Sequence, residues 1–201
     1  MKRGHLILIV LVIVVGVAIA AGMSMLHNGL SARATPAALE VFFARHARRL
    51  SIPSDARNMH NPLPASDENL KAGRNHFADH CASCHANDGS GDTMYGNGLY
   101  PKPPDLTKSE TQNLSDGELF WIIENGVRFT GMPAFGGGHG SKDDSWRLVL
   151  FIRHLPQLAE QERVDMEKMN PKGPEDLDEE KDEQDFLGGE PLQQRVPAKH
   201  H

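Results

Sequence analysis

The chain has 201 residues, of which 39% are hydrophobic and 6% aromatic, and its formal net charge is −6. This length allows one small domain with extensions, and the acidic balance argues against nucleic acid as a partner. The charge is uneven, because residues 1–50 are basic whereas the segment from Gln157 to Glu190 is strongly acidic.

An uncharged apolar run over residues 6–26 follows Lys2 and Arg3 near the start of the chain. As a helix this run would be about 31 Å long, enough to cross the apolar core of a bilayer. Basic residues that precede such a segment stay in the cytoplasm. We therefore expect residues 1–5 to be cytoplasmic and everything after the run to lie outside.

A cleaved signal peptide is the alternative interpretation of the same run. Ala18-Ile19-Ala20 forms an A-x-A site, and cleavage there would release a soluble periplasmic chain that begins at Ala21. We favour an uncleaved single-pass anchor, because the apolar character continues through Met23 and Leu26. Both interpretations export the rest of the chain.

Residues 27–64 are expected to form a linker. Its segment from Leu39 to Leu50 has the apolar spacing of an amphipathic helix and also carries three arginines, Arg45, Arg48 and Arg49. Two interpretations stay open: the arginines lie at lipid headgroups, or the helix packs on the domain that follows. Prolines at 53, 62 and 64 then interrupt regular structure, so the domain is expected to begin near Ala65.

The most informative motif is Cys81-Ala82-Ser83-Cys84-His85. The C-x-x-C-H pattern is typical of c-type haem attachment, in which two thiols one helical turn apart bond one porphyrin and the histidine supplies an imidazole to the iron. A redox dithiol, a disulfide and half of a zinc site are the alternatives. A dithiol does not need the histidine, and a cysteine-based zinc site needs a second ligand pair, whereas the sequence has only these two cysteines. We therefore predict one haem c, held by Cys81 and Cys84, with His85 as the proximal iron ligand.

Three further helices are expected around this motif. One runs from about Asn69 to His80 with Ser66 or Asp67 as its cap, and its Gly73, which costs up to about 1 kcal/mol relative to alanine, indicates close contact with another helix. A capping box at Ser115–Glu118 starts the second helix, which ends at Asn125-Gly126 and carries Trp121 as an expected core residue. The third runs from Ser145 to His154 and stops before Pro156.

The ordered set of motifs resembles the class I cytochrome c family. The resemblance rests on Gly73 and Phe77, Cys81–His85, Pro103-Pro104-Asp105-Leu106, Gly131-Met132-Pro133-Ala134-Phe135, and Trp146 with Phe151. It covers residues 65–156 and implies an all-α fold wrapped round one covalent haem. It also implies that the last helix crosses the first at Gly73 and Phe77.

The resemblance further implies Met132 as the distal iron ligand, opposite His85. A thioether ligand stabilises reduced iron and raises the reduction potential relative to two imidazoles. A carbonyl of Pro103 or Pro104 is implied to accept a hydrogen bond from the His85 ring. Other candidates for the distal position are weaker: Met94 follows His85 too closely, His139 is expected to be an exposed loop residue, and Met59, Met166 and Met169 lie outside the domain.

Residues 157–201 are expected to form an acidic, largely disordered tail. Within it, Glu160 to Met169 could form a short helix, and His200-His201 could bind metal weakly or be incidental. A solvating tail is favoured over a docking site for a basic partner.

The predicted function is single-electron transfer by one haem rather than enzymatic conversion of a small-molecule substrate. Export places the haem domain in the periplasm, tethered to the inner membrane of a bacterium in a respiratory or dehydrogenase chain, with redox proteins or a membrane complex as partners. A haem-bearing subunit of a larger membrane oxidoreductase is the alternative. A ligand sensor or peroxidase needs an open sixth iron position, against which the Gly-Met-Pro motif argues.

Overall fold

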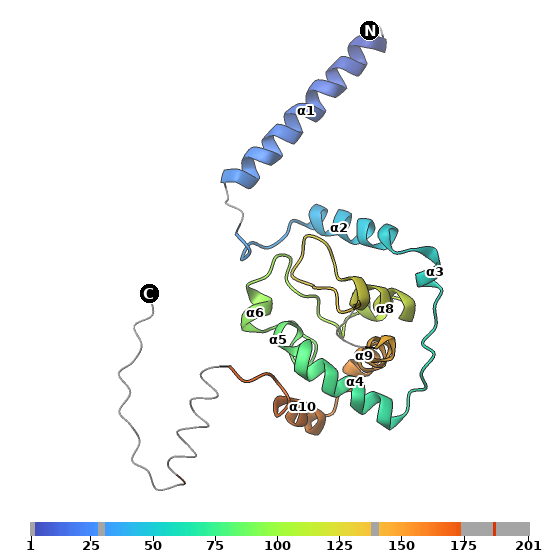
Figure 1. Ribbon diagram of the computed structural model, residues 1–201. Helices are drawn as coiled ribbons and strands as arrows, with labels where there is room; N and C mark the ends of the chain where they lie inside the picture. Colours follow the sequence, from blue (N-terminus) through green and yellow to red (C-terminus); the bar gives the residue numbers. More distant parts are fainter. Residues whose placement is uncertain (1–2, 28–30, 138–140, 174–186, 188–201) are drawn as a thin grey trace.

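The computed structural model describes residues 3–27, 31–137, 141–173 and 187. These residues form helices and connecting loops, and the described part of the chain contains no β-strand (Figure 1). The all-α prediction is therefore confirmed. His139, His200, His201 and most of the acidic tail lie outside the described residues.

Helix α1 (Arg3–His27) stands apart from the helices that carry the core (Figure 1). Its stretch Arg3–Ser24 has a mean hydropathy of 3.2 and is long and apolar enough to cross a membrane. A signal sequence near the N-terminus has the same properties. The apolar helix predicted over residues 6–26 is thus present, and its length alone does not separate an anchor from a signal.

The centre of the fold is the crossing of α4 (Asp67–His80) and α9 (Lys142–His154). A Cβ added at Gly73 would collide with the carbonyl oxygen of Arg147, so the two helices touch backbone to backbone at this point. Next to it, the rings of Phe77 and Phe151 lie with their centroids 5.2 Å apart, and both side chains are buried. The close helix contact predicted from Gly73 is therefore present in the structure.

Helix α8 (Asp116–Asn125) begins at the predicted capping box, in which Ser115 and Glu118 bond each other's backbone. Arg153 of α9 fixes this start, because its guanidinium donates to the carbonyl oxygens of Gln112 and Leu114 and to the Asp116 carboxylate. The buried apolar side chains of α8 are those of Leu119, Phe120 and Ile123. The prediction that Trp121 is a core residue is wrong, because it falls outside this set and is only half-buried.

The segment before the predicted domain also packs on it. Helix α2 (Ala38–Ser51) confirms the helix expected in the linker, and the short α3 (Ser54–Arg57) follows it. Ile52 and Ala56 are buried, and a Cβ at Gly117 of α8 would collide with the carbonyl oxygen of Ala56. Ser115 also donates from its hydroxyl to the Arg57 carbonyl oxygen at 2.7 Å.

The short helix predicted after residue 160 is present as α10 (Glu160–Glu167), which follows the 3-10 turn η1 (Leu155–Gln157) and packs on α4. Its Met166 is fully buried in the core. The side chain of Glu162 accepts from His154 at 2.9 Å and from Arg74 at 3.4 Å. The domain limits of 65 and 156 stay a prediction, but the core draws side chains from both sides of them.

Candidate functional site

The C-x-x-C-H motif forms one helical turn at the end of α4. Cys81 is the C-cap of α4, and its backbone carbonyl accepts hydrogen bonds from the amides of Cys84 and His85 at 3.1 and 2.9 Å. The short helix α5 (Ala82–His85) results. The turn places both thiols and the imidazole on one short rigid element, as predicted from their spacing.

The two cysteines are free thiols and half-buried. Burial, with a smaller contribution from Cys84, raises the pKa of Cys81 to about 12. Redox-active dithiols instead need a lowered pKa, because the thiolate is the reactive form. The described residues also contain no group of three or more His, Cys, Asp or Glu side chains that could hold a metal. The dithiol and zinc interpretations therefore gain no support from the structure.

The His85 ring lies in the interior beside Phe77, with ring centroids 6.5 Å apart. Its Nδ1 is buried, and no hydrogen bond of ordinary geometry reaches it. Burial lowers the pKa of His85, and the backbone carbonyl of Pro104 opposes that effect. The Pro103 carbonyl oxygen lies 2.9 Å from where a Cβ of Gly91 would be, and it is not among the groups that shift the pKa of His85. Of the two prolines, Pro104 is thus the one whose carbonyl lies beside the imidazole.

The loop after the motif folds back over the carbonyl end of α5. The amide of Gly91 donates to the His85 carbonyl oxygen at 2.8 Å, and the Thr93 hydroxyl donates to that of Cys84 at 3.4 Å. Gly91 has φ +76°, a conformation that favours glycine. The short helices α6 (Met94–Asn97) and α7 (Ser109–Gln112) belong to the same connection between α5 and α8. This return brings Pro104 beside His85.

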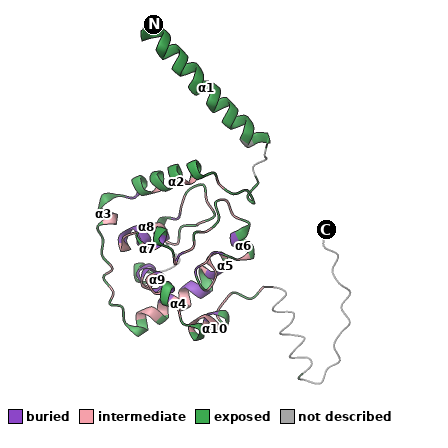
Figure 2. Cartoon of the chain, turned by 180° about the vertical axis from the view of Figure 1, so that it is seen from behind, coloured by how far each residue is buried: buried purple, intermediate pink, exposed green. Residues whose placement is uncertain are grey.

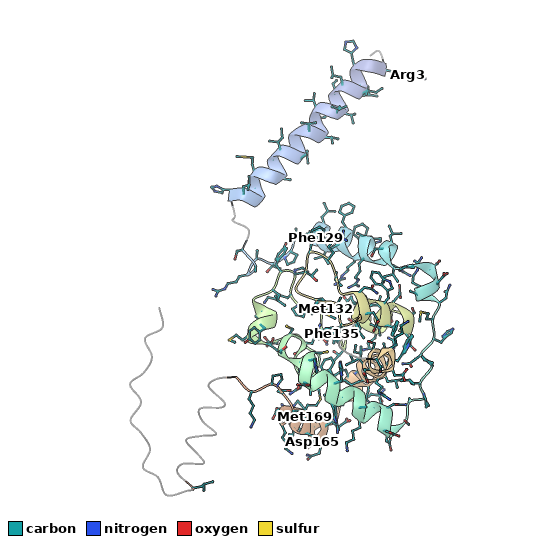
Figure 3. All side chains as sticks on the ribbon, viewed as in Figure 1. Arg3, Phe129, Met132, Phe135, Asp165 and Met169 are labelled. Atoms are coloured by element: carbon teal, nitrogen blue, oxygen red, sulfur yellow. The ribbon has the colours of Figure 1, made fainter. Side chains whose placement is uncertain are left out.

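The loop that carries Met132 is tied to the C-terminal end of α8. The Met132 carbonyl oxygen accepts from the Val127 amide at 3.1 Å, and its amide donates to the Thr130 hydroxyl at 3.1 Å. Two further amides, those of Phe135 and Gly136, donate to α8 carbonyl oxygens, each at 3.0 Å. Met132 is half-buried, and Figure 3 places it in the middle of the domain. The backbone on both sides of Met132 is therefore fixed.

An open groove of about 460 Å³ brings these segments together. Its walls are Ser83, Cys84, Met94, Tyr95, Gly98, Leu99 and Gly131. Cys84 belongs to the C-x-x-C-H turn and Gly131 to the Met132 loop, so the groove lies where the two motifs meet. Pockets of this size are of the class that holds cofactors. The sequence did not predict that Tyr95 and Leu99 line this groove. The adjoining glycines, Gly96 and Gly98, were the available sign of a close approach there.

The groove has features that fit a covalently held porphyrin. One thiol of the motif is in its wall, and apolar side chains line much of it. Next to Cys84 in the chain, though not in the groove wall, the buried Nδ1 of His85 has the Pro104 carbonyl beside it. Met94 also lines the groove but is 79% exposed. It is therefore a closer rival to Met132 than its position in the sequence suggested. Met59 is exposed, Met169 is half-buried against the core, and Met166 is buried in it.

Comparison with known proteins identifies a family for the central part of the chain. Residues 68–152 match the family described as cytochrome c oxidase, cbb3-type, subunit III. No curated protein matches the chain. A solved structure with similarity is the reducing HAO-like protein complex of Kuenenia stuttgartiensis, with 24% identity and a TM-score of 0.43. That alignment covers 47% of this chain and 46% of the other, so the chain spans about half the length of that relative.

Proposed function

Because residues 68–152 form a mono-haem c-type cytochrome domain, we propose that this chain is a single-electron carrier anchored by α1 at the outer face of a bacterial inner membrane. The covalently bound haem supplies the one-electron couple, as its iron alternates between the ferrous and ferric states. The observation that supports this role best is the groove in which Cys84 and Gly131 meet. It joins the attachment turn to the loop of the proposed distal ligand.

In this proposal the α5 turn holds the cofactor on one side. Cys81 and Cys84 would bond the porphyrin, and His85 would bind the iron. The Pro104 carbonyl beside the ring would accept a hydrogen bond from Nδ1–H, which fixes the tautomer and leaves Nε2 for the metal. Such a bond would satisfy the buried Nδ1, which would otherwise cost about 1–3 kcal/mol as an unpaired polar group.

Met132 is the proposed iron ligand on the side opposite His85. Its backbone is bonded to Val127 and Thr130, and the amides of Phe135 and Gly136 after it bond α8, so the backbone from which the thioether extends is fixed. A closed sixth position keeps out water and small ligands, which suits a carrier and not a sensor or peroxidase. The residues of this chain thus bind, orient and shield one redox centre.

The proposed partners are redox proteins of a respiratory or dehydrogenase chain. The matched family is named for a subunit of cytochrome c oxidase, which favours a second candidate function: the chain is the haem-bearing subunit of a larger membrane oxidoreductase. In both cases α1 stays attached and the haem domain lies in the periplasm. Cleavage after Ala20 would instead give a soluble periplasmic carrier.

Replacement of the proposed distal ligand tests the carrier role. The reduced wild-type protein is expected to resist carbon monoxide, whereas Met132→Ala is expected to bind it rapidly, because the sixth position is then open. Met94→Ala is the matched control, since Met94 lines the same groove, and it should behave like wild type. Carbon monoxide binding is followed by the optical spectrum. Rapid binding by the wild type would contradict the carrier role, and opening by Met94→Ala alone would assign the ligand to Met94.

A further inference from the structure

Helix α2 has an apolar face that points away from the domain. Leu39, Phe42, Phe43 and Leu50 recur at the spacing of a single helical face. They are 67%, 52%, 61% and 80% exposed, respectively. His46 shares this face, with its ring centroid 4.1 Å from that of Phe42. Figure 2 shows α2 exposed along nearly its whole length, and none of its residues is buried.

The polar side of α2 is the side that contacts the domain. Glu40 accepts a hydrogen bond from the Tyr100 hydroxyl at 2.7 Å, and Arg45 lies 3.8 Å from Glu110. Val41 and Arg48 are the half-buried residues of the helix. Burial lowers the pKa of Arg48, while Glu118 of α8 opposes that effect. A surface helix of a soluble domain normally has the opposite orientation, with its apolar stripe on the core.

A further apolar side chain, that of Phe129, is exposed at the same end of the molecule. Phe129 is 92% exposed and has φ +62°, a conformation that bulky side chains rarely adopt. Figure 3 places it at the α2 end of the domain. Exposed apolar groups gathered at one end mark an interaction site rather than an ordinary solvated surface.

The connection to α1 indicates what covers this face. Only residues 28–37 separate the end of α1 from the start of α2, and a chain of about ten residues spans at most about 35 Å. If α1 crosses the membrane, the start of α2 therefore lies within about 35 Å of the end of α1. Figure 1 shows α2 on the side of the domain nearest to α1.

The charges of α2 also suit a membrane surface. Arg49 is exposed, whereas Arg45 lies beside Glu110, and Glu40, the acid of this helix, is bonded to Tyr100. A helix with phenylalanine and leucine on one face and arginine beside it is the pattern of segments that lie in the headgroup region of anionic membranes. We propose that α2 lies in the plane of the membrane, with Leu39, Phe42, Phe43 and Leu50 in the lipid and Arg49 at the headgroups. This second contact, which builds on the proposed anchor, would fix which side of the haem domain faces away from the membrane.

A thiol placed on α2 tests, in the full-length holoprotein, whether its apolar face lies in the lipid. The variants are Phe43→Cys on the apolar face and, as the control, Lys71→Cys on the exposed side of α4. The holoprotein is mixed with or reconstituted in liposomes of neutral and anionic phospholipid at less than one chain per vesicle. A charged, membrane-impermeant maleimide then measures thiol accessibility, and the wild type, whose two cysteines hold the haem, gives the background.

The maleimide is expected to modify Phe43→Cys about tenfold more slowly than Lys71→Cys, because an interfacial helix buries its apolar face about 5–10 Å deep. Equal rates would overturn the proposal and leave a protein partner as the occupant, since the dilution removes contacts between copies. The mass of the isolated chain shows separately whether the proposed anchor α1 has been removed by cleavage. A chain that begins at Ala21 would contradict the anchor alone, because the two thiol rates are still compared in the presence of the same liposomes.

Discussion

The double variant Cys81→Ser and Cys84→Ser is expected to contain no covalently bound haem. The serine hydroxyls occupy the same positions on the α5 turn but do not form the thioether bonds, so denaturation should separate chain and cofactor completely. Each single variant should keep one bond and retain part of the haem signal. Haem-dependent staining of the denatured chain on a gel, together with its mass, measures this outcome.

The same variant should also be less stable, because the groove beside Cys84 would lose the group that fills it. A small domain buries limited apolar surface, and a cofactor that binds only the folded state adds its binding free energy to folding. Asp79→Ser, an exposed substitution next to the motif, is the matched control and should retain full haem. Haem that stays on the doubly substituted chain after denaturation would refute attachment through Cys81 and Cys84.

Gly73→Ala is expected to reduce the stability of the holoprotein. Alanine favours the helix over glycine by about 1 kcal/mol, so local propensity alone predicts a more stable protein. At this position, however, the added Cβ would meet the carbonyl oxygen of Arg147, and a backbone atom cannot move aside as a flexible side chain does. Overpacking of this kind costs about 1–3 kcal/mol or more.

Urea unfolding, followed by circular dichroism, measures the free energy of unfolding of this variant. Lys71→Ala, at an exposed position of the same helix, is the control and should change stability by less than about 0.5 kcal/mol. Stability of Gly73→Ala equal to or above that of wild type would show that the crossing of α4 and α9 is looser than described.

Local signals in the sequence predicted most of the elements. The Ser115–Glu118 capping box, the C-x-x-C-H turn and Gly73 each act through neighbours one helical turn away or through one close contact, so their spacing is informative. Long-range packing gave no comparable signal. Ile52 and Met166 are core residues, yet each lies in a short segment whose composition resembles a linker or a tail.

In the candidate site, too, local features were predictable from the sequence and long-range contacts were not. The spacing of Cys81, Cys84 and His85 was sufficient to predict their shared turn. The choice between Pro103 and Pro104 depended on how the loop returns over α5, which is a property of the folded chain. For α2, the apolar pattern predicted a helix but not its orientation. Its polar contacts with Tyr100 and Glu110, far away in sequence, turn the apolar face outwards.

A potentiometric titration of the purified holoprotein, followed by its optical spectrum, tests the central claim most directly. We expect one haem per chain, a single one-electron transition, and the spectrum of iron bound by one imidazole and one thioether in both oxidation states. Titration in several steps, or the spectrum of two imidazole ligands or of an open sixth position, would contradict the assignment of this chain as a His85–Met132 electron carrier.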